Sequence, residues 1–116
     1  MSAAKKSLDK NAVIVFISDN GGSSLTGANN APLTGGKYSF WEVGIRVPLA
    51  IVYPDKIEKG QTITDYISAA DISPTLTNIA KVQVNASDLD GVDLLNPVKD
   101  RLLVWKWQKN LGSETR

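Results

Sequence analysis

Two uninterrupted apolar runs stand out in the hydrophobic pattern, at residues 12–17 and 47–53. Both are rich in β-branched side chains and bounded by turn-forming residues, a pattern typical of strands covered on both faces. The first run predicts a central parallel strand, and the second predicts a strand with Pro48 at its beginning and Pro54 at its end. Residues 102–107 are rich in strand formers and predict a third strand.

Helical spacing is clearest over residues 71–81. An aspartate that can accept hydrogen bonds from free N–H groups stands at the start, and Pro74 falls in the first turn, where proline is tolerated. Leu76, Ile79 and Ala80 follow at i, i+3 and i+4 and predict one buried face. The spacing therefore predicts a helix that runs to about residue 81.

Length and composition fit a single domain. The chain has 116 residues, of which 42% are hydrophobic and 22% are charged, the makeup of a soluble globular protein. The predicted strands and helices indicate an α/β fold over residues 1–116, with no room for two separate cores. A further short helix is predicted at residues 3–8.

Two absences and the charge balance exclude several functions. The chain has no Cys and no His, which removes disulfides, thiolate zinc sites, cysteine nucleophiles and imidazole bases. Lys and Arg number 13 against 12 Asp and Glu, so the charge does not favour nucleic acid or an anionic membrane as a partner. Neither a transmembrane segment nor a signal peptide is predicted, and the compartment stays open.

Two familiar ligand-binding motifs fail on inspection. Residues 35–37 suggest a nucleotide-binding P-loop, but Ala31 stands where that motif needs Gly and Tyr38 where it needs Ser or Thr. Residues 88–91 resemble the middle of an EF-hand loop, yet the first and last ligand positions are not filled by oxygen ligands. Residues 85–87 fit a glycosylation sequon, a triplet that is common by chance.

Polar side chains follow the first predicted strand. Asp19 and Asn20 supply hard oxygen ligands of the kind that Ca²⁺ or Mg²⁺ prefers, and the two glycines after them allow a sharp turn. The carboxyl edge of a parallel sheet is where open α/β folds place ligands, but the same residues also fit an Asx turn that only ends the strand. Lys37 closes a long polar loop and either meets an anionic ligand or is a solvated loop residue.

The order of these segments resembles the later part of the catalytic domain of the sulfatase family, within the alkaline-phosphatase-like superfamily. The segments that carry the resemblance are residues 14–22, 30–37, 41–48, 53–57, 71–76, 90–95 and 103–105. Together they cover about residues 5–110. The resemblance implies a partial three-layer α/β/α alkaline-phosphatase-like fold with a small, mainly parallel sheet.

In the complete enzymes, the resemblance implies hydrolysis of sulfate esters. A formylglycine made from Cys or Ser attacks sulfur, a bound Ca²⁺ polarises the sulfate oxygens, and Lys and His residues stabilise charge and protonate the leaving group. By this resemblance, Asp19 and Asn20 match two metal ligands, and Lys37 matches the lysine that contacts sulfate. Glu42 and Arg46 lie in a family motif whose expected role is pairing and loop fixing rather than catalysis.

The chain also departs from the family pattern. It has no Cys and no His. In the family the nucleophile lies in a Cys/Ser-x-Pro-x-Arg segment, and no Ser of this chain is followed by that pattern. Asp19 and Asn20 offer two or three oxygens where Ca²⁺ takes about six to eight, so no cofactor is expected on the isolated chain and calcium binding should be weak. Val43 replaces a usual Gly, and Thr34 replaces a usual Arg.

The resulting hypothesis is a truncated sulfatase segment that is inactive alone. One alternative is an anion-binding or protein-interaction module that keeps Lys37, and another is a chain that completes an active site with a second polypeptide. Sulfate or another small anion is the expected ligand. Few elements are available to cover residues 12–17 and 49–52, so a homo-oligomer that forms through sheet edges or an apolar face is also expected.

Overall fold

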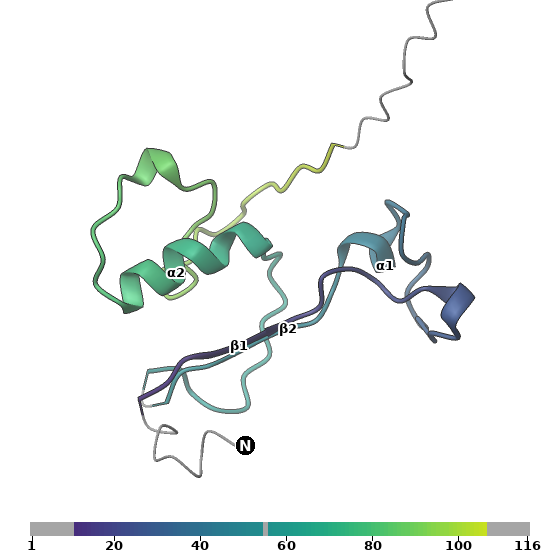
Figure 1. Cartoon of the computed structure of the whole chain (residues 1–116), viewed down its shortest axis with the longest axis horizontal. Coiled ribbons are helices and arrows are strands. Elements are labelled where there is room, and N and C mark those ends of the chain that lie inside the picture. Colours follow the sequence, from purple (N-terminus) through teal and green to yellow (C-terminus); the bar gives the residue numbers. More distant parts are fainter. Residues whose placement is uncertain (1–10, 55, 107–116) are drawn as a thin grey trace, which may run out of the picture. The chain divides into compact units, whose positions relative to one another are not determined.

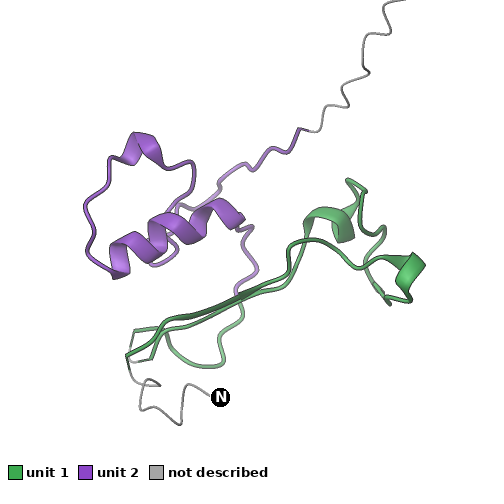
Figure 2. Ribbon diagram, in the orientation of Figure 1, with its two compact units in different colours: residues 1–62 green, residues 63–116 purple. Residues whose placement is uncertain are grey.

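The computed structural model of the protein describes residues 11–54 and 56–106. The chain forms two compact units, unit 1 at Met1–Thr62 and unit 2 at Ile63–Arg116 (Figure 2). Each unit is described by itself. The predicted helix at residues 3–8 lies outside the described residues. The prediction of a single domain over residues 1–116 stays a prediction.

Unit 1 contains two strands, β1 at Ile14–Ile17 and β2 at Leu49–Val52, which lie side by side (Figure 1). They pair antiparallel, so the expectation of a parallel strand is wrong for this pair. The physical reason is the route of the connection. Ile17 pairs with Leu49, which means that the chain between the strands returns to the end of β1 that it left. An apolar run does not give the direction of the partner strand.

The predicted third strand is also absent from the described residues. Residues 102–106 adopt no regular structure, and Trp107 lies outside the described part of the chain. Strand propensity reflects packing against a neighbouring strand more than a preference of the isolated backbone. The only sheet in the described ranges is the β1–β2 pair of unit 1.

The two faces of the β1–β2 pair are both apolar but differ in burial. Alternate residues point to opposite faces. One face is half-buried and the other is exposed, with Phe16 62% exposed and Ile14 and Val52 each 50% exposed. The half-buried face consists of Val15, Ile17, Leu49 and Ile51.

A short helix that the sequence pattern did not predict, α1 at Glu42–Ile45, packs on the loop that follows β1. Its Val43 is only 5% exposed and is the only hydrophobic residue among the described residues that is buried. A Cβ atom at Gly21 would lie 1.7 Å from the Val43 carbonyl oxygen, so only glycine fits at this contact. The loop between them includes a single 3₁₀ turn, η2 at Ser24–Thr26.

Unit 2 is built around the helix α2 at Ile72–Ile79, which follows the 3₁₀ turn η3 at Ala69–Asp71. The helix starts where predicted but ends before Lys81, because that residue has a left-handed φ of 55° that the helical backbone cannot continue through. A second 3₁₀ turn, η4, spans Ala86–Asp88.

The predicted buried face of α2 is wrong for two of its three residues. Leu76 is 39% exposed and Ala80 is exposed, while Ile79 is half-buried, and the fully buried side chains are Asp71 and Thr75. The inward face of the helix is polar because these two residues hydrogen-bond to the segment around residues 92–94. Apolar spacing alone does not reveal a helix face that is buried through hydrogen bonds.

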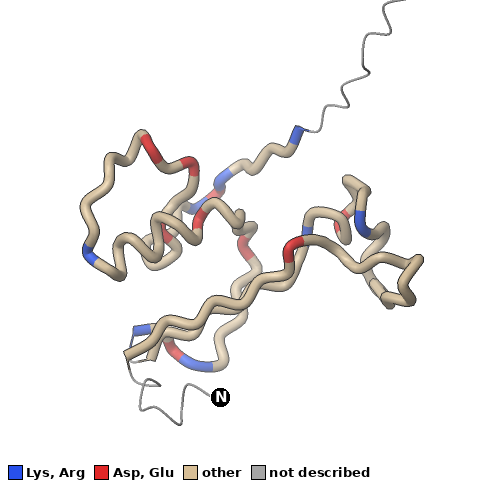
Figure 3. The backbone as a smooth tube through the Cα atoms, viewed as in Figure 1, with Lys and Arg blue, Asp and Glu red and all other residues tan. Residues whose placement is uncertain are grey.

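Charged residues of both signs are interspersed along each unit (Figure 3). The structure thus contains no stretch dominated by one sign within the described ranges. None of the helices described in residues 11–54 and 56–106 has the length and apolar character needed to cross a lipid bilayer.

Candidate functional site

Unit 1 contains an open hollow of about 540 Å³ on the loop that follows β1. It brings together all three predicted site residues, Asp19, Asn20 and Lys37, which come from two separate segments. We call it the Asp19 hollow. The residues that line it are Ser18, Asp19, Asn20, Gly21, Gly22, Ser23, Leu25, Thr26, Ala28, Lys37 and Tyr38.

The chain turns sharply into the hollow at the end of β1. The Ser18 N–H donates to the Pro48 carbonyl oxygen at 3.2 Å, which ties the end of β1 to the start of β2. The Ser18 hydroxyl donates to the Asn20 carbonyl oxygen at 2.9 Å. The turn is therefore closed by serine, and among the described residues the side chains of Asp19 and Asn20 form no hydrogen bond or ion pair. They do not make the Asx turn that the sequence allowed.

Asn30 joins the two segments of the hollow, although the sequence pattern did not mark it among the many asparagines of the polar loop. Its side-chain N–H donates to the Gly22 carbonyl oxygen at 3.0 Å and to the Gly35 carbonyl oxygen at 3.2 Å. The Lys37 N–H donates to the same Gly22 oxygen at 3.1 Å. These bonds hold the backbone of Lys37 beside the loop that carries Asp19.

The Lys37 side chain is exposed at the hollow. Its Nζ lies 5.3 Å from the centre of the Tyr38 ring, a cation–π contact. No ion pair joins Lys37 to a carboxylate of the described residues. The ammonium group is therefore available to an anion from solution.

Glu42 and Arg46 form the ion pair expected of them. Arg46 Nη1 lies 3.0 Å from Glu42 Oε1, one helical turn apart, and the two side chains are about half exposed. Neither residue lines the Asp19 hollow. Their position agrees with a role in fixing the loop rather than in contacting a ligand.

The sulfatase family model matches residues 1–82 of this chain, a span that includes the whole Asp19 hollow. The chain belongs to the sulfatase family. It is 34% identical over 93 residues to arylsulfatase J of Mus musculus, covering 79% of this chain and 16% of the mouse protein. It is also 34% identical over 97 residues to steryl-sulfatase of Homo sapiens, covering 76% of this chain and 17% of the human protein.

The fold of this chain also matches part of a solved structure. The crystal structure of Ps i-CgsB matches with a TM-score of 0.76 and 38% sequence identity. The match covers 80% of this chain and 21% of that chain. The chain therefore has the fold of one piece of a sulfatase, and it spans about a sixth of the length of the curated relatives.

The donors of the Asp19 hollow suit the calcium of sulfatases in kind but not in number. The Asp19 carboxylate and the Asn20 amide oxygen are hard ligands of the type that Ca²⁺ takes. Neither side chain forms a hydrogen bond or an ion pair with another described residue. Within residues 11–54 and 56–106, however, no group of three or more His, Cys, Asp or Glu side chains is arranged to hold a metal ion. Asp19 and Asn20 fit one part of a calcium site, and oxygen ligands from elsewhere are needed to complete it.

In unit 2 of this sulfatase piece, a buried carboxylate is used differently. Asp71 accepts hydrogen bonds from the Ser68 N–H at 2.7 Å and the Val92 N–H at 2.9 Å, and both terminal nitrogens of Arg101 donate to it. Burial by itself would raise the pKa of Asp71, but these hydrogen bonds outweigh it and hold the pKa below its usual range. The same contact raises the pKa of Arg101.

The sequence predicted Asp71 only as a helix cap. Its carboxylate instead caps η3, where it forms a capping box with Ser68. Nothing in the local spacing pointed to Arg101, because that partner is distant in sequence and is set by the tertiary fold.

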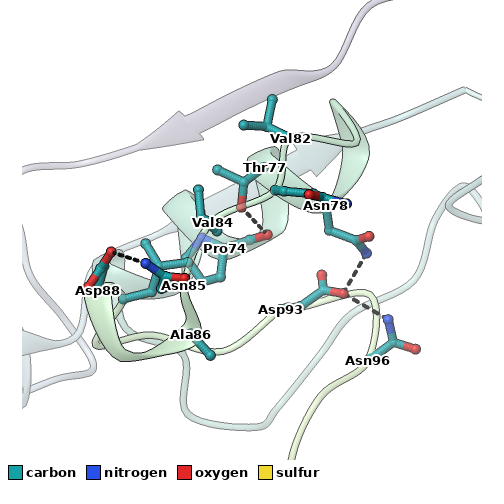
Figure 4. A pocket seen from close by; sticks show the side chains of 12 residues that line it. Pro74, Thr77, Asn78, Val82, Val84, Asn85, Ala86, Asp88, Asp93 and Asn96 are labelled. Atoms are coloured by element: carbon teal, nitrogen blue, oxygen red, sulfur yellow. Dashed lines mark hydrogen bonds between the residues drawn. The ribbon is translucent and has the colours of Figure 1, made fainter.

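A larger hollow of about 1020 Å³ lies beside α2 in unit 2 (Figure 4). Asp93 stands at its edge and accepts a hydrogen bond from each of Asn78 and Asn96 at 2.7 Å. These polar groups bind one another, and none of the predicted site residues lines this hollow. The Asp19 hollow is the candidate site because the side chains of Asp19, Asn20 and Lys37 form no hydrogen bond or ion pair with the described residues.

Proposed function

We propose that this chain supplies the sulfate-holding part of a sulfatase site and that its 116 residues do not hydrolyse sulfate esters by themselves. The observation that carries the proposal is the meeting of Asp19, Asn20 and Lys37 at one hollow. Each of these side chains lacks a hydrogen-bonding or ion-pair partner among the described residues. Polar groups that the fold leaves open in a concave site are available to a ligand.

Each residue has a distinct role in this proposal. The Lys37 ammonium attracts a sulfate oxygen as a compact positive charge. Asp19 and Asn20 would contribute oxygen ligands to Ca²⁺, and further carboxylates would have to complete the site, because Asp19 is the only carboxylate among the described residues that line the hollow. When bound, Ca²⁺ supplies Lewis-acid polarisation of the sulfate group.

The absence of turnover follows from the chemistry that the residues lack. Attack on sulfur needs a nucleophile, and transfer of a proton to the leaving group needs an acid. The 116 residues contain no Cys and no His, and no Ser lies in a Cys/Ser-x-Pro-x-Arg segment. Binding energy toward sulfate alone does not break the ester bond.

The complete protein is proposed to hydrolyse sulfuric esters within one α/β/α domain whose sheet is mainly parallel. Support comes from the relatives, which are about six times longer than the matched piece and are named as sulfatases. Ps i-CgsB has been crystallised in complex with k-i-k-neocarrahexaose, which supports a carbohydrate as the organic part of one substrate class.

Titration with methyl sulfate tests the binding role. We expect Lys37→Met to weaken binding about tenfold or more, because it removes a charge-assisted contact. Lys59→Met is the matched control, since Lys59 is an exposed lysine of unit 1 that does not line the hollow. Equal effects of the two substitutions would refute the assignment of Lys37.

A separate assay tests the absence of turnover. The purified chain is expected to release no 4-nitrophenol from 4-nitrophenyl sulfate, with or without Ca²⁺. Turnover that disappears in Lys37→Met would overturn the proposal.

One observation favours a second candidate, an anion-binding or interaction module. Lys37 is available to an anion even though the nucleophile is missing from these residues. Mixing the chain with a sulfatase fragment that carries the Cys/Ser-x-Pro-x-Arg segment distinguishes the two. Activity that appears only in the mixture supports the sulfatase site, and saturable sulfate binding without activity in the mixture supports the module.

The exposed face of the β1–β2 pair supports self-association of the isolated chain. Phe16 is 62% exposed beside other apolar side chains, and a face of this kind is stabilised when a second copy covers it. Light scattering is expected to give a mass above that of one chain at micromolar concentration, and Phe16→Asp should lower it. Neither nucleic acid nor a membrane is proposed as a partner. A single-chain mass for the unmodified protein contradicts self-association.

A further inference from the structure

Tyr38 is placed in the Asp19 hollow in a way that its own packing does not explain. It lines the hollow next to Lys37 and is 92% exposed. Its φ is 72°, in the left-handed region that bulky residues rarely adopt. Such a conformation persists only when the surrounding structure imposes it, and it is concentrated at functional sites.

The backbone on both sides of Tyr38 imposes this conformation. On one side, the Lys37 N–H is bound to the Gly22 carbonyl oxygen. On the other side, the Ser39 N–H donates to the Gly36 carbonyl oxygen at 3.1 Å, and the Ser39 hydroxyl donates to the same oxygen at 2.8 Å. The direction in which the tyrosine leaves the backbone is thus fixed, although its ring packs in no core.

The ring is also adjacent to the group that is proposed to contact sulfate. Because Lys37 Nζ lies 5.3 Å from the ring centre, an ester whose sulfate meets Lys37 brings its organic group within reach of the ring. Leu25 lines the same hollow and is 93% exposed. The hollow therefore combines a charged and polar part with two exposed apolar side chains.

We propose that Tyr38, with Leu25, binds the organic group of the sulfate ester and selects substrates that present a flat, weakly polar face. An aromatic ring stacks on tyrosine directly, and the C–H face of a pyranose ring packs on it in the same manner. This inference rests on the proposed function, since it assumes that the sulfate group is held at Lys37.

Titration of the full chain with three probes tests the proposal. The probes are methyl sulfate, phenyl sulfate and glucose 6-sulfate. Phenyl sulfate, glucose 6-sulfate or both are expected to bind about fivefold more tightly than methyl sulfate, the gain expected of one aromatic contact. A gain for only one of the ring probes identifies the aromatic or the pyranose class. Equal affinity for all three probes overturns the inference.

Substitutions at Tyr38 separate binding from folding. Tyr38→Gly is expected to remove the preference for ring probes without lowering stability, because glycine adopts a φ of 72° freely. Tyr38→Phe should keep the preference, and Leu25→Ala should reduce it. Tyr66→Ala is the matched control, since Tyr66 is 69% exposed and does not line the hollow.

The results also distinguish this inference from the proposed function. If Tyr38→Gly leaves the preference for ring probes unchanged, the role of Tyr38 is refuted while sulfate binding at Lys37 stands. If ring probes bind through Tyr38 and Lys37→Met has no effect on any probe, the sulfate assignment fails while the Tyr38 contact stands. If no probe binds, both are refuted.

Discussion

Asp71 in unit 2 and Asp19 in unit 1 are the same residue type in opposite situations. Asp71 is fully buried and accepts hydrogen bonds from Ser68, Val92 and Arg101. Asp19 is exposed at a hollow and accepts none from the described residues. A carboxylate whose bonds are satisfied by its own chain stabilises the fold, whereas one that is left open is available to a ligand. The difference separates a carboxylate that holds the fold together from one that is proposed to bind a ligand, within one sulfatase piece.

The largest test of this comparison is Asp71→Asn. We expect it to lower the free energy of unfolding by about 3 kcal/mol, because it leaves the Arg101 guanidinium in a mostly buried site without its charge partner. The amide nitrogen of Asn also faces N–H donors where a carboxylate oxygen stood. Urea unfolding followed by circular dichroism measures the loss.

The matched control for this substitution is Asp19→Asn. It should change stability by less than about 0.5 kcal/mol, since an exposed residue without partners contributes little to the fold. Equal losses for Asp71→Asn and Asp19→Asn would break the comparison.

Two glycines sharpen the same contrast. A Cβ atom at Gly21 would lie 1.7 Å from the Val43 carbonyl oxygen in unit 1, and one at Gly91 would lie 2.2 Å from the Ala70 carbonyl oxygen in unit 2. Each substitution to Ala is expected to cost about 2 kcal/mol, because the packed backbone must move. Only Gly21→Ala should also weaken methyl sulfate binding, since Gly21 lines the Asp19 hollow. If Gly91→Ala weakened methyl sulfate binding as much as Gly21→Ala at a similar loss of stability, this expectation would be contradicted.

Asp19, Asn20 and Lys37 were weak signals taken singly, and the resemblance to sulfatases selected them as candidates. The structure brings all three to one hollow, and their roles toward metal and sulfate stay predictions. The direction of β2 could not be predicted, because it depends on where a long loop returns rather than on the residues of the strand.

Hydrogen bonds that the sequence pattern does not reveal explain two further errors. The buried face of α2 was predicted from its apolar residues, but Thr75 is buried because its hydroxyl donates to the Asp71 carbonyl oxygen and accepts from the Leu94 N–H. Asn30 was missed for the same reason, since its partners are set by the course of the loop. Residue type indicates which groups need a partner, but the tertiary fold decides which one they find.

Acid titration gives a smaller effect with a defined sign. The folded state lowers the pKa of Asp71, so the carboxylate stabilises the fold fully above the unfolded value of about 3.9. This contribution is lost as the pH falls through the lowered folded pKa. The stability difference between the natural chain and Asp71→Asn should therefore be constant near neutral pH and shrink in acid below about pH 4.

Urea unfolding at a series of pH values measures this difference. Arg101→Met serves as the comparison, since it keeps Asp71 but removes a principal group that lowers its pKa. The free energy of unfolding of Arg101→Met should fall less in acid than that of the unsubstituted chain. A stability difference that grows in acid would show that the sign assigned to Asp71 is wrong.

The smallest effect is expected for the second ion pair of the described residues, Glu42–Arg46. Its geometry is good, with 3.0 Å between Arg46 Nη1 and Glu42 Oε1, but the two side chains are 54% and 55% exposed. Water screens both charges, so a double-mutant cycle with Glu42→Gln and Arg46→Met should give a coupling of about 0.5 kcal/mol or less. The same cycle at Asp71 and Arg101 should give a clearly larger value, because those groups have little access to water. If the two couplings were equal, burial would not be what separates the structural carboxylate from the exposed ones.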